Sequence, residues 1–334
     1  MNTMVLAAGL GTRLRPITQT VPKPMVPVLN RPVMEHIVRL LKSHGFSQVV
    51  ANLHWFPETI TDHFGDGSGF GVNLEYSREE ALLGTAGGVF AARDFLGDSF
   101  LVISGDALTD IDLTSMREFH ESHDGVATLA ARKVKDTSEF GVIITDDPGR
   151  IQGFQEKPEP AEALSDLANC GIYMFNREIF DFFPEPGQSK LAEPGQPEGF
   201  ADWALDVFPA LMDSGLPFYA HEIDSYWNDV GSVSEFLQGS FDGLNGVIDL
   251  GIEEPEVEPG VRVARGVGLD GVEIKGPVLI AAGCEIAAGA ELTGPVVLGR
   301  DCTVGEGARL KETILLDGSD LPAGSFSVGG VLGR

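Results

Sequence analysis

Aliphatic residues recur at every sixth position in the C-terminal part of this 334-residue chain, and this period constrains the fold more than any other feature. The later members keep one register: Ile280, Ile286, Leu292, Leu298, Val304 and Leu310. An earlier set keeps the same step: Val257, Val263 and Leu269. The register then slips by one residue, because Ile274 follows Leu269 after five positions. A six-residue period is typical of a parallel β-helix, in which each step forms a short strand and a bend. A loop region rich in glycine and valine, the alternative, would not keep these residues in phase.

A second set of residues supports the same repeat. Small or aliphatic side chains stand four positions after the later aliphatic residues: Cys284, Ala290, Val296, Cys302, Ala308 and Ile314. Three six-residue steps close one coil, so Cys284 and Cys302, eighteen residues apart, are expected at equivalent corners of adjacent coils as inward-pointing free thiols.

With Cys170 the chain has only three cysteines, which is too few for a disulfide scaffold. This low number fits a protein of the reducing cytoplasm.

Residues 1–235 show a different pattern, in which short apolar strands alternate with helical segments. The predicted strands are TMVLA, QVVANL, VNLEYS and SFLVISGD, and the predicted helices are VMEHIVRLLKSHG, capped by Gly45, and PETITDHFG. This order predicts an α/β domain with a Rossmann-like, mostly parallel sheet that binds ligands at the carboxyl ends of its strands. The stretch 232–244 is predicted to be helical. We therefore divide the chain into a domain at 1–235, a connecting helix at 236–250 and a β-helix domain at 251–334.

Composition excludes several classes of function. The chain has 50 Asp and Glu against 23 Lys and Arg, a formal net charge of −27. Such a charge repels phosphate-rich partners, so we expect no binding to nucleic acid or to anionic membranes. No apolar run approaches the roughly 18 residues of a membrane span.

One segment departs from this acidic composition. Residues 4–24, MVLAAGLGTRLRPITQTVPKP, contain no acidic residue. The loop lacks the lysine of a P-loop, and Leu14 stands where a dinucleotide fingerprint needs its third glycine. What remains is a glycine-containing loop whose backbone amides can approach phosphates, with Arg13 and Lys23 supplying positive charge.

These residues carry a resemblance to a known family. LAAGLGTRLRP followed by PKPMVPVLNRP resembles the signature of the sugar-1-phosphate nucleotidyltransferases, or NDP-sugar pyrophosphorylases. The resemblance continues, in family order, through EEALLGTAGG, LVISGDAL, EFGVI, FQEKP, ANCGIYMFN and YWNDVGS. Several members carry a C-terminal hexapeptide tail, so the resemblance covers nearly the whole chain and implies a left-handed parallel β-helix. It also implies that an NTP and a sugar 1-phosphate react to give an NDP-sugar and pyrophosphate by Mg²⁺-dependent in-line displacement.

The resemblance also implies a role for each matching residue. Arg13 and Lys23 resemble the catalytic cations that contact the phosphates, whereas Arg15 is a weaker candidate. The implied nucleotide-binding residues are Leu6, Ala7, Ala8, Gly9, Gly11, Thr12, Gly84 and Thr85. The implied sugar-phosphate-binding residues are Gly141, Glu156, Lys157, Asn169 and Gly171. Asp106 and Asp229 resemble the two aspartates that hold Mg²⁺, and we expect their carboxylates within about 8 Å of each other, a distance that one ion with its water can bridge.

The motifs leave the substrates open. LGTAG after two glutamates, NRPVMEHIV and YWNDVGS resemble mannose-1-phosphate guanylyltransferases, which favours GTP and mannose 1-phosphate. AAGLGTR is closer to uridylyl- and thymidylyltransferases, so a glucose-1-phosphate uridylyl-, thymidylyl- or adenylyltransferase is the alternative. A non-catalytic regulatory or scaffold subunit of the same architecture is a further alternative, although such subunits tend to lose the charged residues that this chain keeps. A hexapeptide acyltransferase is disfavoured, because no histidine follows His221. We expect the tail to be structural and the protein to be a homo-oligomer.

Overall fold

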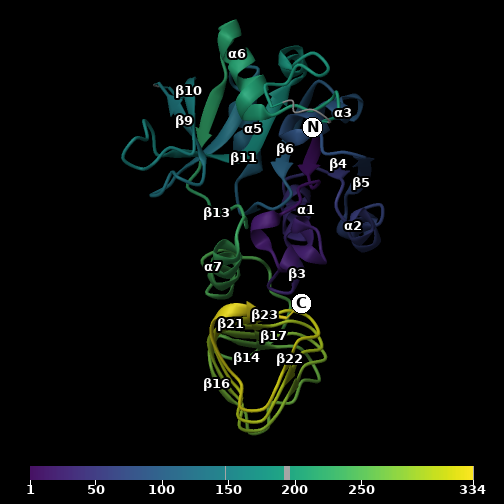
Figure 1. Ribbon diagram of the computed structural model, residues 1–334, viewed down its shortest axis with the longest axis vertical. Coiled ribbons are helices and arrows are strands. Elements are labelled where there is room, and N and C mark those ends of the chain that lie inside the picture. Colours follow the sequence, from purple (N-terminus) through teal and green to yellow (C-terminus); the bar gives the residue numbers. More distant parts are fainter. Residues whose placement is uncertain (147, 192–195, 334) are drawn as a thin grey trace. The chain divides into compact units, whose positions relative to one another are not determined.

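The computed structural model describes residues 1–146, 148–191 and 196–333 (Figure 1). The chain divides into two compact units. The first contains residues 1–10, 22–24 and 37–227, and the second contains residues 11–21, 25–36 and 228–334. The cationic N-terminal segment is therefore shared between the units: Lys23 belongs to the first and Arg13 to the second.

A single mixed sheet organises the first unit. Its described strands are β1 (Asn2–Leu6), β4 (Gln48–Leu53), β5 (Asn73–Arg78), β6 (Ser99–Ser104), β8 (Ala127–Lys133), β9 (Gly141–Thr145), β10 (Ile151–Glu156), β11 (Leu167–Asn176) and β12 (Tyr219–Glu222). The path β6-β1-β4-β5 is parallel throughout, as the sequence predicts for this half. Beyond β6 the sheet continues through β11, which is antiparallel to β6, β8 and β9. The predicted α/β fold is confirmed, with antiparallel strands added on one side.

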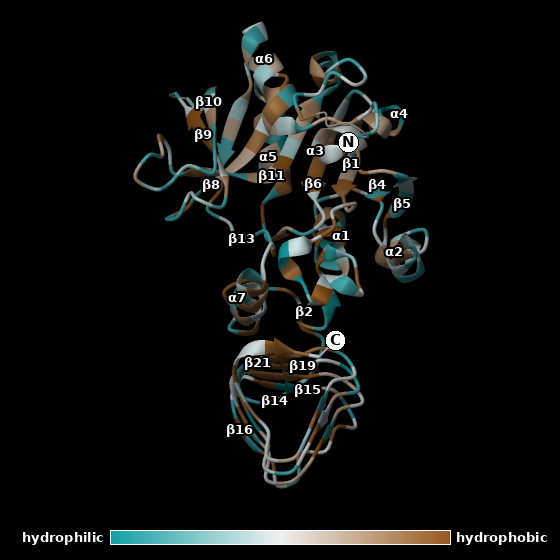
Figure 2. Ribbon diagram, in the orientation of Figure 1, coloured by the Kyte–Doolittle hydropathy of each residue, from teal (hydrophilic) through white to brown (hydrophobic). Residues whose placement is uncertain are grey.

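Helices and short turns complete the first unit. The described helices are α1 (Val33–Ser43, whose first turn lies in the second unit), α2 (Pro57–Phe64), α3 (Gly84–Ala91), α4 (Arg93–Leu96), α5 (Leu113–Glu121) and α6 (Phe208–Ser214), and a π-helical turn spans Trp203–Val207. Gly45 ends α1 with a positive φ, and the Phe46 amide donates to the Leu41 carbonyl, so the predicted cap is confirmed. Figure 2 shows the central strands β1 and β6 as largely hydrophobic, and their interior residues are buried.

Short strands build most of the second unit, and all but the first pair in parallel. They are β14 (Glu256–Glu258), β15 (Val261–Val263), β16 (Glu273–Lys275), β17 (Val278–Ile280), β18 (Glu285–Ile286), β19 (Glu291–Leu298), β20 (Thr303–Val304), β21 (Arg309–Leu315), β22 (Asp320–Leu321) and β23 (Phe326–Leu332). Pairs such as Leu292 with Leu310 and Ile286 with Val304 join residues one coil apart. The predicted parallel β-helix is confirmed, including the one-residue slip before Ile274, because Val263 pairs with Ile280 seventeen positions on.

Two residues of the predicted repeat lie elsewhere. Val257 is 53% exposed, because β14 runs antiparallel to β15 before the regular coils begin. Ile314 is buried but pairs with Val297, while Leu315 pairs with Leu298 and belongs to the interior core. The cause is a second slip at Glu312, a single residue with positive φ where the preceding coil has a Gly-Pro pair. Alternation along the strand then turns Ile314 away from the interior.

The two cysteines of the β-helix occupy the predicted positions. Cys284 and Cys302 are buried free thiols in the interior core, and their neighbours Glu285 and Thr303 pair directly in adjacent coils. The Cys284 thiol donates to the Gly299 carbonyl at 3.0 Å. Both thiols therefore serve packing rather than chemistry.

The remaining elements of the second unit surround the start of the β-helix. Helix α7 (Val233–Leu244) begins at Ser232, whose hydroxyl accepts from the Glu235 amide, as predicted for this stretch. The short strands β2 (Pro27–Val28) and β3 (Arg31–Pro32) form a hairpin. Arg31 donates to the carbonyl of Leu250 at 2.8 Å and forms an ion pair with Glu253. An N-terminal segment is thus bonded to the entry of the β-helix.

Candidate active site

A cavity of about 340 Å³ opens at the carboxyl ends of β1, β4, β5 and β6, where the sequence places a ligand. This volume lies within the usual range for small-molecule sites. The lining residues are Leu6, Ala8, Gly9, Lys23, Pro24, Asn52, Glu79, Leu82, Gly84, Thr85, Ser104, Asp106 and Phe200. Seven of them are site residues that the sequence predicts, so the fold brings together segments that are far apart along the chain.

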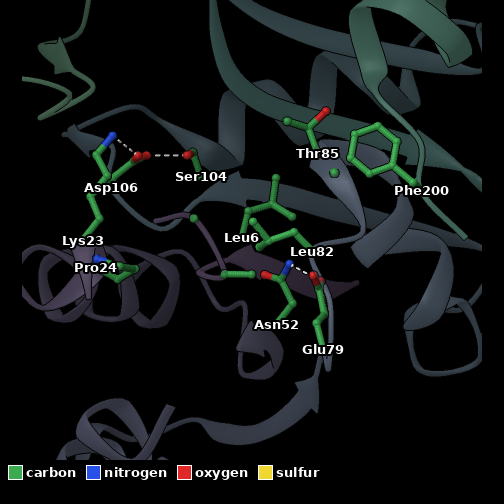
Figure 3. A pocket seen from close by; sticks show the side chains of 13 residues that line it. Leu6, Lys23, Pro24, Asn52, Glu79, Leu82, Thr85, Ser104, Asp106 and Phe200 are labelled. Atoms are coloured by element: carbon green, nitrogen blue, oxygen red, sulfur yellow. Dashed lines mark hydrogen bonds and ion pairs between the residues drawn. The ribbon is translucent and has the colours of Figure 1, made fainter. Parts of the chain in front are cut away.

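One end of the cavity is charged. The Lys23 ammonium forms an ion pair with the Asp106 carboxylate, and the Ser104 hydroxyl donates to the same carboxylate (Figure 3). Lys23 stands on a 3-10 turn between two prolines, and Asp106 follows β6 directly. The two side chains are only 13% and 19% exposed, so their charges are screened weakly by water. This end can hold an anion next to Lys23 and a cation next to Asp106.

A hydrogen-bonded pair supports the middle of the cavity. Asn52 accepts from the Ala7 amide at 2.7 Å and donates to Glu79 at 2.7 Å, and the other Glu79 oxygen accepts from the Leu83 amide. Both side chains are nearly buried. A Cβ on Gly88 would lie within 2.6 Å of both side chains, so a larger residue there would displace the pair. The pair fixes the backbone at the end of β1 relative to the start of α3.

The other end is formed by the start of α3 and by a distant segment. Gly84 begins α3 with a φ of +79°, which glycine adopts without strain. The Thr85 hydroxyl donates to Asp202 at 2.8 Å and accepts from the Trp203 amide at 3.1 Å. Phe200 lines this end of the cavity.

The second unit holds Arg13 and Asp229, the other predicted catalytic cation and the other predicted metal ligand. Arg13, on the 3-10 turn Thr12–Leu14, lies 3.9 Å from Asp229, with the two side chains 51% and 25% exposed. A Cβ on Gly231 would lie 2.9 Å from both groups, so a larger residue there would displace the two side chains. Gly11 has a φ of +60° and its carbonyl accepts from Thr18 at 2.7 Å. Asp106 and Asp229 belong to different units, and their predicted proximity stays a prediction.

The predicted sugar residues gather on β9, β10 and β11, and none of the five lines the cavity described above. Gly141 pairs with Glu156, and Lys157, with a φ of +46°, places its ammonium 4.0 Å from the Glu156 carboxylate. Asn169 accepts from the Gly171 amide at 3.1 Å and donates to the Tyr173 hydroxyl at 3.0 Å. These groups form a separate polar cluster within the first unit.

The buried thiol between the last two sugar residues is not reactive. Burial raises the pKa of Cys170 well above its usual range, so the thiolate that a nucleophile requires does not form. Its carbonyl accepts from the Trp227 indole at 3.0 Å. Cys170 therefore has a packing role rather than a chemical one.

The chain matches a known protein family. The family model described as nucleotidyl transferase matches residues 2–245.

This chain belongs to the nucleotidyl transferase family.

Among curated relatives, a UTP–glucose-1-phosphate uridylyltransferase from Synechocystis sp. is 40% identical over 86% of this chain and 76% of its own length. A mannose-1-phosphate guanylyltransferase from Mycobacterium tuberculosis is 32% identical over the same shares. A solved structure from Bacillus anthracis, assigned as a glucose-1-phosphate thymidylyltransferase in complex with sucrose, matches with a TM-score of 0.63 and 24% identity, covering 77% of this chain and 98% of that one. At this identity the structural match establishes the fold alone.

Six residues that line this nucleotidyl transferase's cavity are not among the predicted site residues: Pro24, Asn52, Glu79, Leu82, Ser104 and Phe200. Asn52 and Glu79 are polar residues at or just after the ends of predicted strands, so the position that singles out Asp106 could also have found them. Phe200 carries no such signal, because it lies in an irregular segment rich in proline and glycine. Only the folded chain places it at the cavity.

Proposed function

We propose that this nucleotidyl transferase transfers a uridylyl group from UTP to glucose 1-phosphate and releases pyrophosphate. The observation that supports this choice is the 40% identity to a uridylyltransferase of that specificity, against 32% to the guanylyltransferase over the same share of the chain. The coarser activity, nucleotidyl transfer to a sugar 1-phosphate, is common to both relatives.

A second candidate has its own support. The LGTAG segment at the start of α3 resembles the guanylyltransferase motif, and Gly84 and Thr85 of this segment line the cavity. Guanylyl transfer from GTP to mannose 1-phosphate is therefore the alternative, and it differs from the first proposal in both base and sugar.

The proposed reaction needs no protein nucleophile. A phosphate oxygen of the sugar 1-phosphate forms a bond to the α-phosphorus of the nucleotide, and the bond from that phosphorus to the pyrophosphate oxygen breaks. Negative charge builds up on the equatorial and leaving oxygens, so fixed cations lower the barrier. Lys23 supplies such a cation at the charged end of the cavity. Arg13 supplies a second, on the loop that the resemblance assigns to the phosphates.

The residues present fit a magnesium ion. Mg²⁺ takes one or two protein carboxylates and completes its shell with substrate oxygens and water. Asp106 is a carboxylate at the cavity, and the described residues contain no group of three or more His, Cys, Asp and Glu that could hold a metal without substrate. We propose that Asp106 and Asp229 hold Mg²⁺, which would screen the repulsion between the two anionic substrates.

A substrate matrix tests the proposal. Pyrophosphate release is measured for UTP, GTP, dTTP and ATP, each with glucose 1-phosphate and mannose 1-phosphate, with the Lys23→Ala variant as a control for contaminating activity. We expect UTP with glucose 1-phosphate to give the highest kcat/KM. GTP with mannose 1-phosphate winning by tenfold or more, about 1.4 kcal/mol of transition-state binding, would establish the alternative.

The assembly state remains a proposal. None of the predicted site residues lies in residues 251–334, and we propose that this domain serves a structural role in a homo-oligomer. Light scattering of the purified protein tests this, and a monomeric mass at micromolar concentration would contradict it.

None of the helices in the described part of the chain has the length and apolar character of a membrane span.

A further inference from the structure

The two ends of the cavity differ in chemistry. Figure 3 shows Lys23, Asp106 and Ser104 on one side and Thr85 and Phe200 on the other, with Leu6 and Leu82 between them. A nucleoside triphosphate has a matching asymmetry, because its phosphates are charged and its base is a flat, uncharged ring whose faces stack on apolar groups. Phosphates next to Lys23 therefore direct the base toward the end that contains Phe200.

Phe200 is held in place by its neighbours. The Ala201 amide donates to the Leu83 carbonyl at 2.9 Å, and the Ala201 carbonyl accepts from the Ala86 and Gly87 amides at 3.0 and 3.2 Å. These bonds join Ala201, the residue that follows Phe200, to the start of α3. The Phe200 ring itself packs on the bare backbone of Gly84, since a Cβ there would lie 3.1 Å from two ring carbons.

A buried carboxylate anchors the same segment from behind. Asp206 is only 6% exposed and accepts from the Ser189 hydroxyl, the Lys190 amide and the Asp202 amide at 2.7–2.9 Å. Asp202 in turn accepts from Thr85. The backbone next to Phe200 is therefore fixed before any ligand arrives, which lowers the entropy cost of binding.

The ring also differs from its aromatic neighbours. Phe90 and Phe180 contact each other, and Phe183 contacts both Phe90 and Trp203. Within the part of the chain that the structure describes, Phe200 makes no ring–ring contact, and it is half-buried at the cavity wall. A ring in this position is available to a ligand's ring.

We propose that Phe200 is a base-contacting residue of the nucleotide site, and that it contributes to the choice of nucleotide. This inference rests on the proposed nucleotidyl transfer but not on which base or sugar is preferred. Stacking of a base on an aromatic ring contributes enough affinity that its loss weakens binding about tenfold. Because every base has an aromatic face, stacking alone tolerates any base, and discrimination arises from how well each base fits the cavity beside Phe200.

The test compares Phe200→Ala with Phe200→Tyr, using whichever nucleotide the wild type prefers. We expect Phe200→Ala to raise the KM for the nucleotide about tenfold, with the KM for sugar 1-phosphate changed less than twofold. Phe200→Tyr should stay within threefold of wild type for both. Inhibition by inorganic tripolyphosphate, which has no base, should have the same inhibition constant in all three proteins. Leu205→Ala, an exposed apolar residue of the same stretch, is the matched control.

The outcomes separate the two proposals. A wild type that prefers another nucleotide or sugar overturns the proposed substrates and leaves the Phe200 comparison intact. If the wild type shows no turnover, calorimetry with UTP and GTP replaces the KM measurement. A folded Phe200→Ala protein whose nucleotide KM or Kd stays within twofold overturns the inference. A rise confined to the KM for sugar 1-phosphate, or a weakened tripolyphosphate inhibition, also overturns it.

Discussion

Lys23 and Asp106 form an ion pair at the charged end of the cavity, although the sequence motifs assign one to a phosphate and the other to a metal ion. Each charge compensates the other, because both side chains are poorly solvated. Under the proposed function, a substrate phosphate would replace Asp106 as the partner of Lys23. Mg²⁺ would likewise replace Lys23 as the partner of Asp106. The pair thus keeps both groups at the site before the substrates bind.

The first prediction concerns this pair. Lys23→Ala and Asp106→Asn should each lower kcat about 100-fold, because each removes a charge that acts on the transition state. The double variant should lose less than the product of the two effects, since the groups act on the same phosphates. Lys133→Ala, which breaks the exposed pair with Glu222, is the control and should change kcat less than twofold. A Lys23→Ala effect below threefold removes that residue from the catalytic set.

The second prediction concerns the other cation. Arg13→Ala should lower kcat about 100-fold if its guanidinium stabilises the leaving pyrophosphate. Arg15, exposed two residues further on, is the matched control, and Arg15→Ala should change kcat less than threefold. Steady-state pyrophosphate release measures both. Equal losses for the two variants would point to the net charge of the loop rather than to a positioned Arg13.

The third prediction concerns the Asn52–Glu79 pair. Asn52→Leu leaves the Ala7 amide and a Glu79 oxygen without their buried partner, so the free energy of unfolding should fall by about 2 kcal/mol. The KM for the nucleotide should rise too, because the backbone of β1 and the start of α3 both line the cavity. Denaturant unfolding and kinetics measure the two effects. Glu80→Gln, an exposed neighbour, is the control, and equal behaviour of the two variants would refute a supporting role.

The fourth prediction concerns Arg31, whose side chain is 11% exposed. Arg31→Ala removes the ion-pair partner of Glu35, itself 8% exposed, and the hydrogen bonds to two backbone carbonyls, so stability should fall by about 3 kcal/mol. Hydrogen exchange should quicken locally in residues 25–36 and 250–256. Glu253→Gln, at a 67% exposed site, should cost less than 1 kcal/mol. Unchanged exchange in both segments would show that Arg31 does not tie them together.

A histidine network in the first unit leads to the fifth prediction. The Thr128 hydroxyl bridges His120 and His123 at 2.8 and 2.9 Å, the other His120 nitrogen faces the Asn176 oxygen, and the Gly125 amide donates to His123. These partners are all satisfied when both imidazoles are neutral. Burial lowers the pKa of both histidines below the ordinary 6.5, and for His123 the nearby His120 lowers it further.

The unfolded chain therefore binds more protons than the folded chain as the pH falls through the ordinary histidine pKa. The contribution of the two neutral histidines to the free energy of unfolding is fully present above about pH 6.5 and is lost as the pH falls below it. Thermal unfolding between pH 5 and 8 should show Tm falling toward the acid side. His120→Gln should flatten that slope, whereas His63→Gln, at an exposed histidine, should leave it unchanged. A slope that persists in His120→Gln would assign the effect to other groups.

Much of the fold can be predicted from the sequence because it is carried by local periods. The six-residue aliphatic repeat indicates the coil of the β-helix, and it also indicates the slip before Ile274. The slip at Glu312 does not show in the sequence. One residue stands there where the preceding coil has a Gly-Pro pair, and the two adjacent residues Ile314 and Leu315 are both aliphatic, so either could continue the six-residue repeat. Which of the two faces inward depends on strand pairing, not on hydrophobicity.

The sequence by itself determined the parallel strands of the first unit, the coils of the β-helix and the residues that stand at the ends of those strands, because these follow from spacing along the chain. The tertiary structure alone decided which of them meet. It paired Lys23 with Asp106, joined Asn52 to Glu79 and brought Phe200 against Gly84 across more than a hundred residues. Such contacts depend on how strands order within a sheet and where loops return, and no local pattern encodes either. The site therefore has a local part, which motifs indicate, and a long-range part, which only folding assembles.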